Sequence, residues 1–203
     1  MSSWNQLLTE ASSGGHVVQL YGKDDRSLAK NVGRFLAEGV RQLDGLVVIA
    51  TPAHTQAISR HLAEEGAGAA LAAEREGRLV FLDARETLDR LLVEGQPDRR
   101  RFESVVGGVL AEVLACSGSG KVRAFGEMVS LLWAGGHQEE ARILEGLWNE
   151  LLAGSRCSLY CAYAIDLFGD GVDTAGLSAI VAAHSHLLAG HNTLLSSVPA
   201  GAQ

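Results

Sequence analysis

Cysteine and long apolar runs are both scarce in this sequence. Cysteine occurs three times in 203 residues, at Cys116, Cys157 and Cys161, a sparse and odd set that suits a reducing compartment better than a disulfide framework. No stretch approaches the roughly 20 uncharged apolar residues that span a bilayer. The N-terminus, MSSWNQLLTE, also lacks the basic and apolar regions of a signal peptide. We therefore expect a cytoplasmic protein without a membrane segment.

Positive charge is also in short supply. The 17 Lys and Arg residues against 24 Asp and Glu give a formal net charge of -7 and a pI near 5.5. This balance argues against nucleic-acid binding, which requires a basic face. The exception is the run Arg99 to Arg101, which is shorter than the roughly four to eight clustered cations of a membrane-binding segment. We interpret it as the solvated start of a helix.

Nucleotide-binding loops are missing their key residues. After the first predicted strand stands Gly22-Lys23-Asp24, but a phosphate-binding loop needs a glycine where Val17 lies and a hydroxyl where Asp24 lies. A second glycine-rich stretch, SGSGKV at 117–122, precedes a strand instead of a helix and also lacks the hydroxyl. The G-x-G-x-x-G, G-x-S-x-G and H-E-x-x-H motifs are absent as well. We therefore do not expect triphosphate to be held and cleaved.

Metal-binding spacing is not evident either. Cys157 and Cys161 should share one face of a strand about 13 Å apart, too far for one ion, and we interpret both as core residues. His184 and His186 would point to different sides of a helix. His16 begins the first strand, where we expect a structural hydrogen bond. The sequence thus predicts neither a metal nor another cofactor.

Apolar runs alternate with helical patterns along the chain. A helical repeat follows the first run, with Leu28, Val32 and Leu36 spaced four apart. Strands that are apolar throughout must be covered on both faces. This pattern predicts a three-layer αβα fold with a mainly parallel sheet. The expected strands are His16–Tyr21, Gly45–Ala50, Arg78–Ala84, a fourth beginning near Lys121, and Cys157–Ile165, with a last helix around Ala175–Ala189.

Length and composition fit one domain. The chain has 203 residues, of which 47% are hydrophobic. It can therefore bury a sizeable core as one domain, and its length does not require a second. We expect residues 1–15 to be a lead-in, residues 16–190 to form the α/β domain, and residues 191–203 to be a poorly ordered tail.

Polar side chains are expected where the parallel strands end, which is where open α/β sheets bind ligands. Glu127, after a permissive glycine and near the end of the fourth strand, is our first candidate, although it could instead be solvated or cap a helix. Asp83 and Thr51 also suit helix N-caps, and the two tyrosines also suit a core position with a satisfied hydroxyl. The predicted ligand-binding residues are Tyr21, Thr51, Asp83, Glu127 and Tyr163.

Six ordered segments carry a resemblance to a known family. They read HVVQLY, VVIATPAH, GRLVFLDARETL, VRAFGEMVSLLW, LEGLWNELL and SLYCAY. The chain resembles the MEDS domain, the sensory domain named from methanogens, methylotrophs and the regulator DcmR, over about residues 16–190. The pairs FGEMV…LLW and LWN…CAY are the most specific part of this resemblance.

The resemblance implies a bacterial or archaeal signalling module with a fold similar to the RecA/KaiC-type ATPase core. By that analogy the segment after Tyr21 occupies the place of the phosphate loop, Thr51-Pro52 that of a catalytic glutamate, and Glu127 lies near the end of the magnesium-binding strand. The first two are degraded here, which favours binding over hydrolysis.

We therefore expect a non-enzymatic, stand-alone sensor that binds a small organic ligand, a protein partner such as a histidine kinase or transcriptional regulator, or both. The alternatives are a degenerate nucleotide-binding module and an enzyme that uses Glu127 and Asp83. The sequence does not determine the oligomeric state, and a homo-oligomer is one of the possible states.

Overall fold

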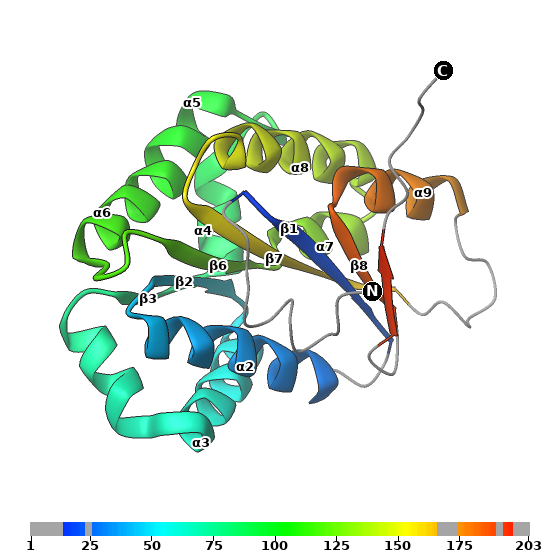
Figure 1. The fold of residues 1–203 in the computed structure, drawn as a ribbon. Helices are drawn as coiled ribbons and strands as arrows, with labels where there is room; N and C mark the ends of the chain where they lie inside the picture. The colour runs from blue at the N-terminus through cyan, green and yellow to red at the C-terminus, as the bar shows by residue number, and fades with distance from the viewer. Residues whose placement is uncertain (1–13, 23–25, 166–173, 190–192, 197–203) are drawn as a thin grey trace.

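A mainly parallel sheet forms the centre of the molecule (Figure 1). The structure, a computed structural model, describes residues 14–22, 26–165, 174–189 and 193–196. Within these residues the sheet has seven strands in the order β3-β2-β6-β7-β1-β8-β9, and β9 alone runs antiparallel to its neighbour. The strands are β1 (His16–Tyr21), β2 (Gly45–Ala50), β3 (Leu79–Asp83), β6 (Val122–Gly126), β7 (Cys157–Ala164), β8 (His186–Ala189) and β9 (Thr193–Ser196).

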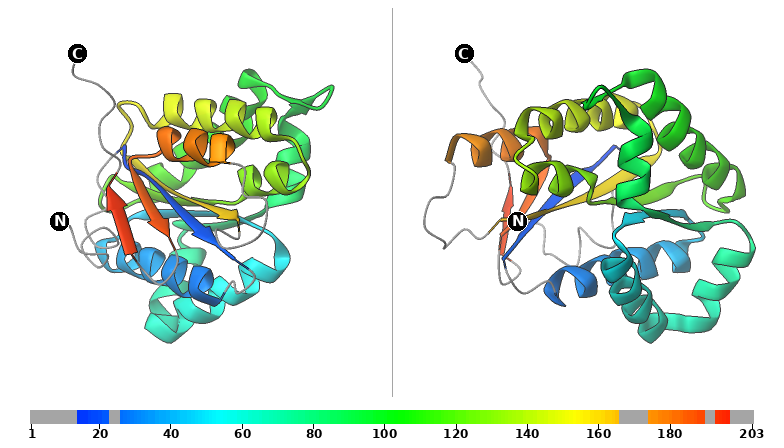
Figure 2. Two further views of the ribbon diagram at one scale, coloured as in Figure 1. Left: turned by 90° about the vertical axis from the view of Figure 1, so that its right-hand side faces the viewer. Right: turned by 180° about the vertical axis from the view of Figure 1, so that it is seen from behind.

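Helices cover both faces of this sheet, as Figure 2 shows from two further sides. One face carries α2 (Arg26–Gln42) and α3 (Pro52–Arg75), which has non-helical backbone angles at Gly66. A short hairpin, β4 (Leu92–Val93) and β5 (Gln96–Pro97), lies outside the main sheet. The opposite face carries α4 (Ala84–Leu91), α5 (Arg99–Phe102), the π-helical turn η1 (Glu103–Gly107), α6 (Gly108–Cys116), α7 (Met128–Ala134), α8 (Gln138–Leu152) and α9 (Thr174–Ala183). The predicted three-layer α/β fold is confirmed.

The five strands β1, β2, β3, β6 and β7 supply side chains to two separate cores. Successive side chains of a strand point to opposite faces, so in β2 Val47 and Ile49 join the core under α4 to α8 whereas Leu46 and Val48 join the core under α2 and α3. All six β2 residues are buried. Because both faces are covered, the strand is apolar along its whole length.

The C-terminal part differs from the expectation. The helix expected over Ala175–Ala189 ends at Ala183, and His186–Ala189 instead pairs in parallel with β1 as β8. Thr193–Ser196, expected in a poorly ordered tail, form β9 against β8. The periodicity of a short apolar run does not distinguish a helix from a strand. Here the run forms a strand because it pairs with the edge of β1. Residues 1–13, 190–192 and 197–203 lie outside the described residues.

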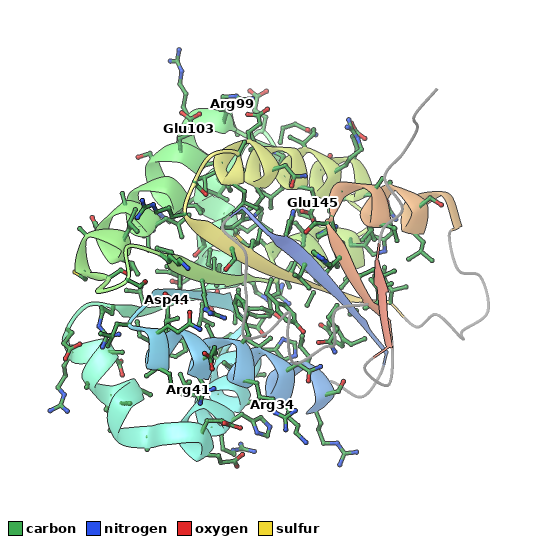
Figure 3. All side chains as sticks on the ribbon, viewed as in Figure 1. Arg34, Arg41, Asp44, Arg99, Glu103 and Glu145 are labelled. Atoms are coloured by element: carbon green, nitrogen blue, oxygen red, sulfur yellow. The ribbon has the colours of Figure 1, made fainter. Side chains whose placement is uncertain are left out.

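A buried ion pair joins β6 to the turn after α2. Arg123 Nε donates to Asp44 Oδ2 at 2.7 Å, and both side chains are almost fully buried. Ser119 Oγ donates to the other carboxylate oxygen of Asp44 at 2.5 Å, and the Arg123 guanidinium lies 5.2 Å from the centre of the Phe35 ring. Asp44, labelled in Figure 3, thus lies buried directly before the first residue of β2.

Among the described residues, no helix combines the length and the apolar character needed to cross a bilayer.

Candidate functional site

Glu127 lies buried at the C-terminal end of β6, between the sheet and α3. Its exposure is 2%, so the solvated alternative is wrong. Its carboxylate accepts a hydrogen bond from the Thr51 backbone N–H and contacts His54 Nδ1. Glu127 also occupies the N-cap position of α7, but its side chain makes no capping hydrogen bond there. Both of its carboxylate oxygens are therefore engaged by the chain itself.

The other strand-end candidates serve local structure. Asp83 accepts hydrogen bonds from the backbone N–H groups of Arg85 and Glu86, at 2.8 and 3.0 Å, so its predicted capping role at α4 is confirmed. Thr51 occupies the N-cap position of α3, before Pro52, but its side chain makes no capping bond. The expected side-chain cap is therefore wrong, and it is the Thr51 backbone N–H that makes a contact, donating to the Glu127 carboxylate at the end of β6.

Tyr21 and Tyr163 lie on opposite faces of the sheet. Tyr21 packs against the core under α2 and α3, with its ring edge-on to His54 at 6.0 Å between centroids. Tyr163 is buried in the other core, where its hydroxyl donates to Glu145 Oε1 at 2.7 Å. The structure therefore brings Thr51, Glu127 and Tyr21 near one another around His54 and places Tyr163 elsewhere. Within the described residues, the five predicted side chains therefore lie on two faces of the sheet.

A pocket of about 140 Å³ lies at Tyr163, bounded by α7, α8 and α9. Its deepest residues, Ala141, Glu145, Tyr163 and Ile180, are buried, and the Trp133 ring stands edge-on to the Tyr163 ring at 5.8 Å. Its outer residues are polar and exposed, namely Gln138, Glu139 and Arg142, of which the last two form an ion pair. From α9 come Gly176, Ala179, Ile180 and Ala183.

Glu145 is the charged group at the base of this pocket. It reaches from α8 to the Tyr163 hydroxyl on β7, and Figure 3 labels its position. Burial alone would raise the pKa of Glu145, but His184, His16 and the Tyr163 hydroxyl outweigh burial and hold that pKa below its usual value. Burial and the adjacent Glu145 charge raise the pKa of the Tyr163 phenol. The base of the pocket is thus a carboxylate that accepts from a neutral phenol.

Two residues next to Glu145 extend this polar region into the sheet. Burial, followed by the neighbouring His184, lowers the pKa of His16 from 6.5 to about 4, so this imidazole is neutral near pH 7. Burial and the Glu145 charge raise the pKa of the Cys161 thiol well above its usual value, and the thiol is therefore protonated.

Residues 15–185 match the family model described as MEDS: MEthanogen/methylotroph, DcmR Sensory domain. The chain belongs to the MEDS family. This MEDS domain is accordingly a member of a sensory-domain family, as the six sequence segments predicted. Comparison with curated proteins gave no match.

Sequence reasoning did not find the groups that surround Tyr163 in this MEDS domain. Glu145 lies beside the apolar stripe of α8 and looks like an ordinary helix carboxylate, and Trp133 lies within α7, a short helix that the sequence pattern did not separate. The sequence suggests only His186 as a partner for His184, whereas the residues that His184 contacts in the structure are far away in sequence. The available signal was weak, because residues that meet through β-strand crossovers share no fixed spacing.

Proposed function

We propose that this protein is a non-catalytic sensory domain that binds a small, mainly apolar organic molecule in the pocket between α7, α8 and α9. The composition of the pocket is the observation that supports this proposal. Its walls are apolar, Trp133 supplies an aromatic ring, and two polar groups, Tyr163 and Glu145, converge at its base. Small-molecule sites are usually composed in this way. Of the five residues predicted from sequence, Tyr163 belongs to this pocket.

The size of the pocket sets the size of the ligand. A volume near 140 Å³ is close to that of an engineered cavity of about 150 Å³ that binds benzene. A ligand with about six non-hydrogen atoms gains at most about 9 kcal/mol, from a ceiling of about 1.5 kcal/mol per atom. Its Kd is then no tighter than roughly 0.1–1 µM. We therefore expect sensing in the micromolar to millimolar range.

Signal transmission requires that the ligand prefer one arrangement of the protein over another. Gln138 and Glu139 at the outer edge of the pocket lie in the first turn of α8, directly after the turn at residues 135–137, and Ala179 and Ala183 belong to α9. We propose that an occupied pocket favours one position of this turn and of α9 against the sheet. The output partner would be a histidine kinase or a transcriptional regulator that contacts this surface.

The experiment that tests the proposal compares two panels of compounds by thermal shift. Small apolar organics such as benzene, chlorobenzene and butanol should raise Tm, whereas ATP, ADP and cyclic nucleotides with magnesium should not. A nucleotide-specific rise in Tm that Glu127→Gln abolishes would instead support a degenerate nucleotide-binding module. Turnover of a screened compound that Glu127→Ala eliminates would support an enzyme, and either result would overturn this proposal.

A further inference from the structure

Four buried side chains with metal-binding donor atoms meet beneath the pocket. His16 begins β1, Glu145 lies on α8, Cys161 lies on β7, and His184 follows α9. Within the described part of the chain, one donor atom from each lies within 4.8 Å of all the others. Their exposures are between 1% and 5%, so the group is enclosed by protein.

Three of the separations between these side chains are close to those of a tetrahedral coordination shell. His16 Nε2 lies 3.2 Å from Cys161 Sγ and 3.4 Å from Glu145 Oε2, and His184 Nε2 lies 3.3 Å from Glu145 Oε1. Ligand bonds of about 2.0–2.3 Å in tetrahedral geometry place donor atoms roughly 3.3–3.8 Å apart. The two N···O distances, one to each carboxylate oxygen of Glu145, lie within this range, and the N···S distance lies just below it. A single central ion would therefore require small movements of these side chains.

Outward hydrogen bonds orient both imidazoles. Asn149 Nδ2 donates to the Ala183 carbonyl at 3.0 Å, which leaves Asn149 Oδ1 to accept from His16 Nδ1 at 2.8 Å. His184 Nδ1 lies 2.6 Å from the Ile180 carbonyl, which can only accept. Each ring therefore carries its proton on Nδ1, and in the neutral form its Nε2 lone pair faces the centre. Metal-bound histidines show this outer arrangement.

Two of the inward atoms have no hydrogen-bond partner among the residues that the structure describes. Glu145 Oε2 and His184 Nε2 are buried and unsatisfied, because their close contacts at 3.4 and 3.3 Å lack hydrogen-bond geometry. Two imidazole lone pairs and a carboxylate thus face one another, and the Cys161 thiol is the sole inward proton donor among the four when both rings are neutral. Buried acceptors left unpaired are costly, and a cation at the centre would satisfy all of them.

We propose that His16, Glu145, Cys161 and His184 form a closed four-ligand site for Zn²⁺. Two imidazoles, a thiolate and a carboxylate suit this ion, and four protein ligands are typical of a structural site. On binding, the Cys161 thiol loses its proton to solvent and its sulfur bonds to the metal. The ion would tie the end of α9 to β1, β7 and α8. The competing occupant is a proton on His184, which would form an ion pair with Glu145.

Metal content of the purified full-length chain tests this site, with Cys161→Ser compared with Cys157→Ser. Cys157 lies on the same strand and is also buried, but it is not among the four ligands. We expect one zinc per chain in the wild type and in Cys157→Ser, and at least about tenfold weaker binding in Cys161→Ser and His184→Gln. At a hundredfold excess over Kd, zinc should raise Tm of the metal-free wild type by about 5–10 °C. Circular dichroism verifies the fold of each variant.

No zinc bound by the wild type after titration would overturn the proposal, as would equal affinity in Cys161→Ser and Cys157→Ser. If Cys161→Ser does not fold, Co²⁺ substitution of the wild type decides, since a thiolate–cobalt charge-transfer band is expected and its absence would refute the thiolate ligand. These measurements use metal alone. Their failure leaves the organic-ligand proposal standing, and failure of that proposal leaves the zinc site standing.

Discussion

Filling the pocket from α9 should abolish ligand binding without unfolding the protein. Ala179 lines the pocket, and Ala179→Leu adds three carbon atoms at that position. A pocket of about 140 Å³ that suits a molecule of about six heavy atoms cannot hold both. Leucine and alanine are both strong helix formers, so α9 itself should be little affected.

The expected size of the effect follows from ligand linkage. At a hundredfold excess over Kd, a bound compound stabilises the folded wild type by about 2.7 kcal/mol. For a domain of this length this corresponds to a rise in Tm of about 5–10 °C. In Ala179→Leu the rise should fall below about 1 °C, which corresponds to less than about half a kcal/mol of linked binding.

Thermal shift across a concentration series of the strongest compound measures this difference. Ala182→Leu is the matched control, because Ala182 is exposed on the same helix and does not line the pocket. The control should keep the wild-type response. An equal response in Ala179→Leu and the wild type would refute the location of the site.

Two further predictions concern the rest of the chain. Arg123→Met should lower the free energy of unfolding by about 3–5 kcal/mol, because Asp44 remains buried without its charged partner. Adding Asp44→Leu should restore much of this stability in urea denaturation. An Arg123→Met variant as stable as the wild type would show that the ion pair does not stabilise the fold. In the native metal-free protein Cys116, which is exposed, should react with a thiol reagent, whereas Cys157 and Cys161 should react only after unfolding. Burial raises the pKa of Cys157 to about 12, and rapid modification of all three thiols in the folded protein would contradict this.

The sheet and its layers were predictable because they depend on local patterns. An apolar run such as Gly45–Ala50 signals a strand covered on both faces, and Asp83 three residues before Glu86 signals a helix start. The run His186–Ala189 was assigned to a helix because four residues do not distinguish the two periods, and pairing with β1 determines the outcome.

The polar group beneath the pocket was not predictable in the same way. His16, Glu145, Cys161 and His184 come from four segments spread over most of the chain, and only the strand order brings β1 beside β7. The strand-end rule correctly placed Glu127 near Thr51, but it did not show that the chain satisfies this carboxylate itself. That outcome depends on His54, which no motif singled out.

The most direct measurement of the central claim is a crystal structure of the protein saturated with the small organic compound that raises Tm most. The account predicts density for the compound over Tyr163 and Glu145, between α7, α8 and α9. Density at the strand ends beside Thr51 and Glu127, with the pocket empty, would contradict it.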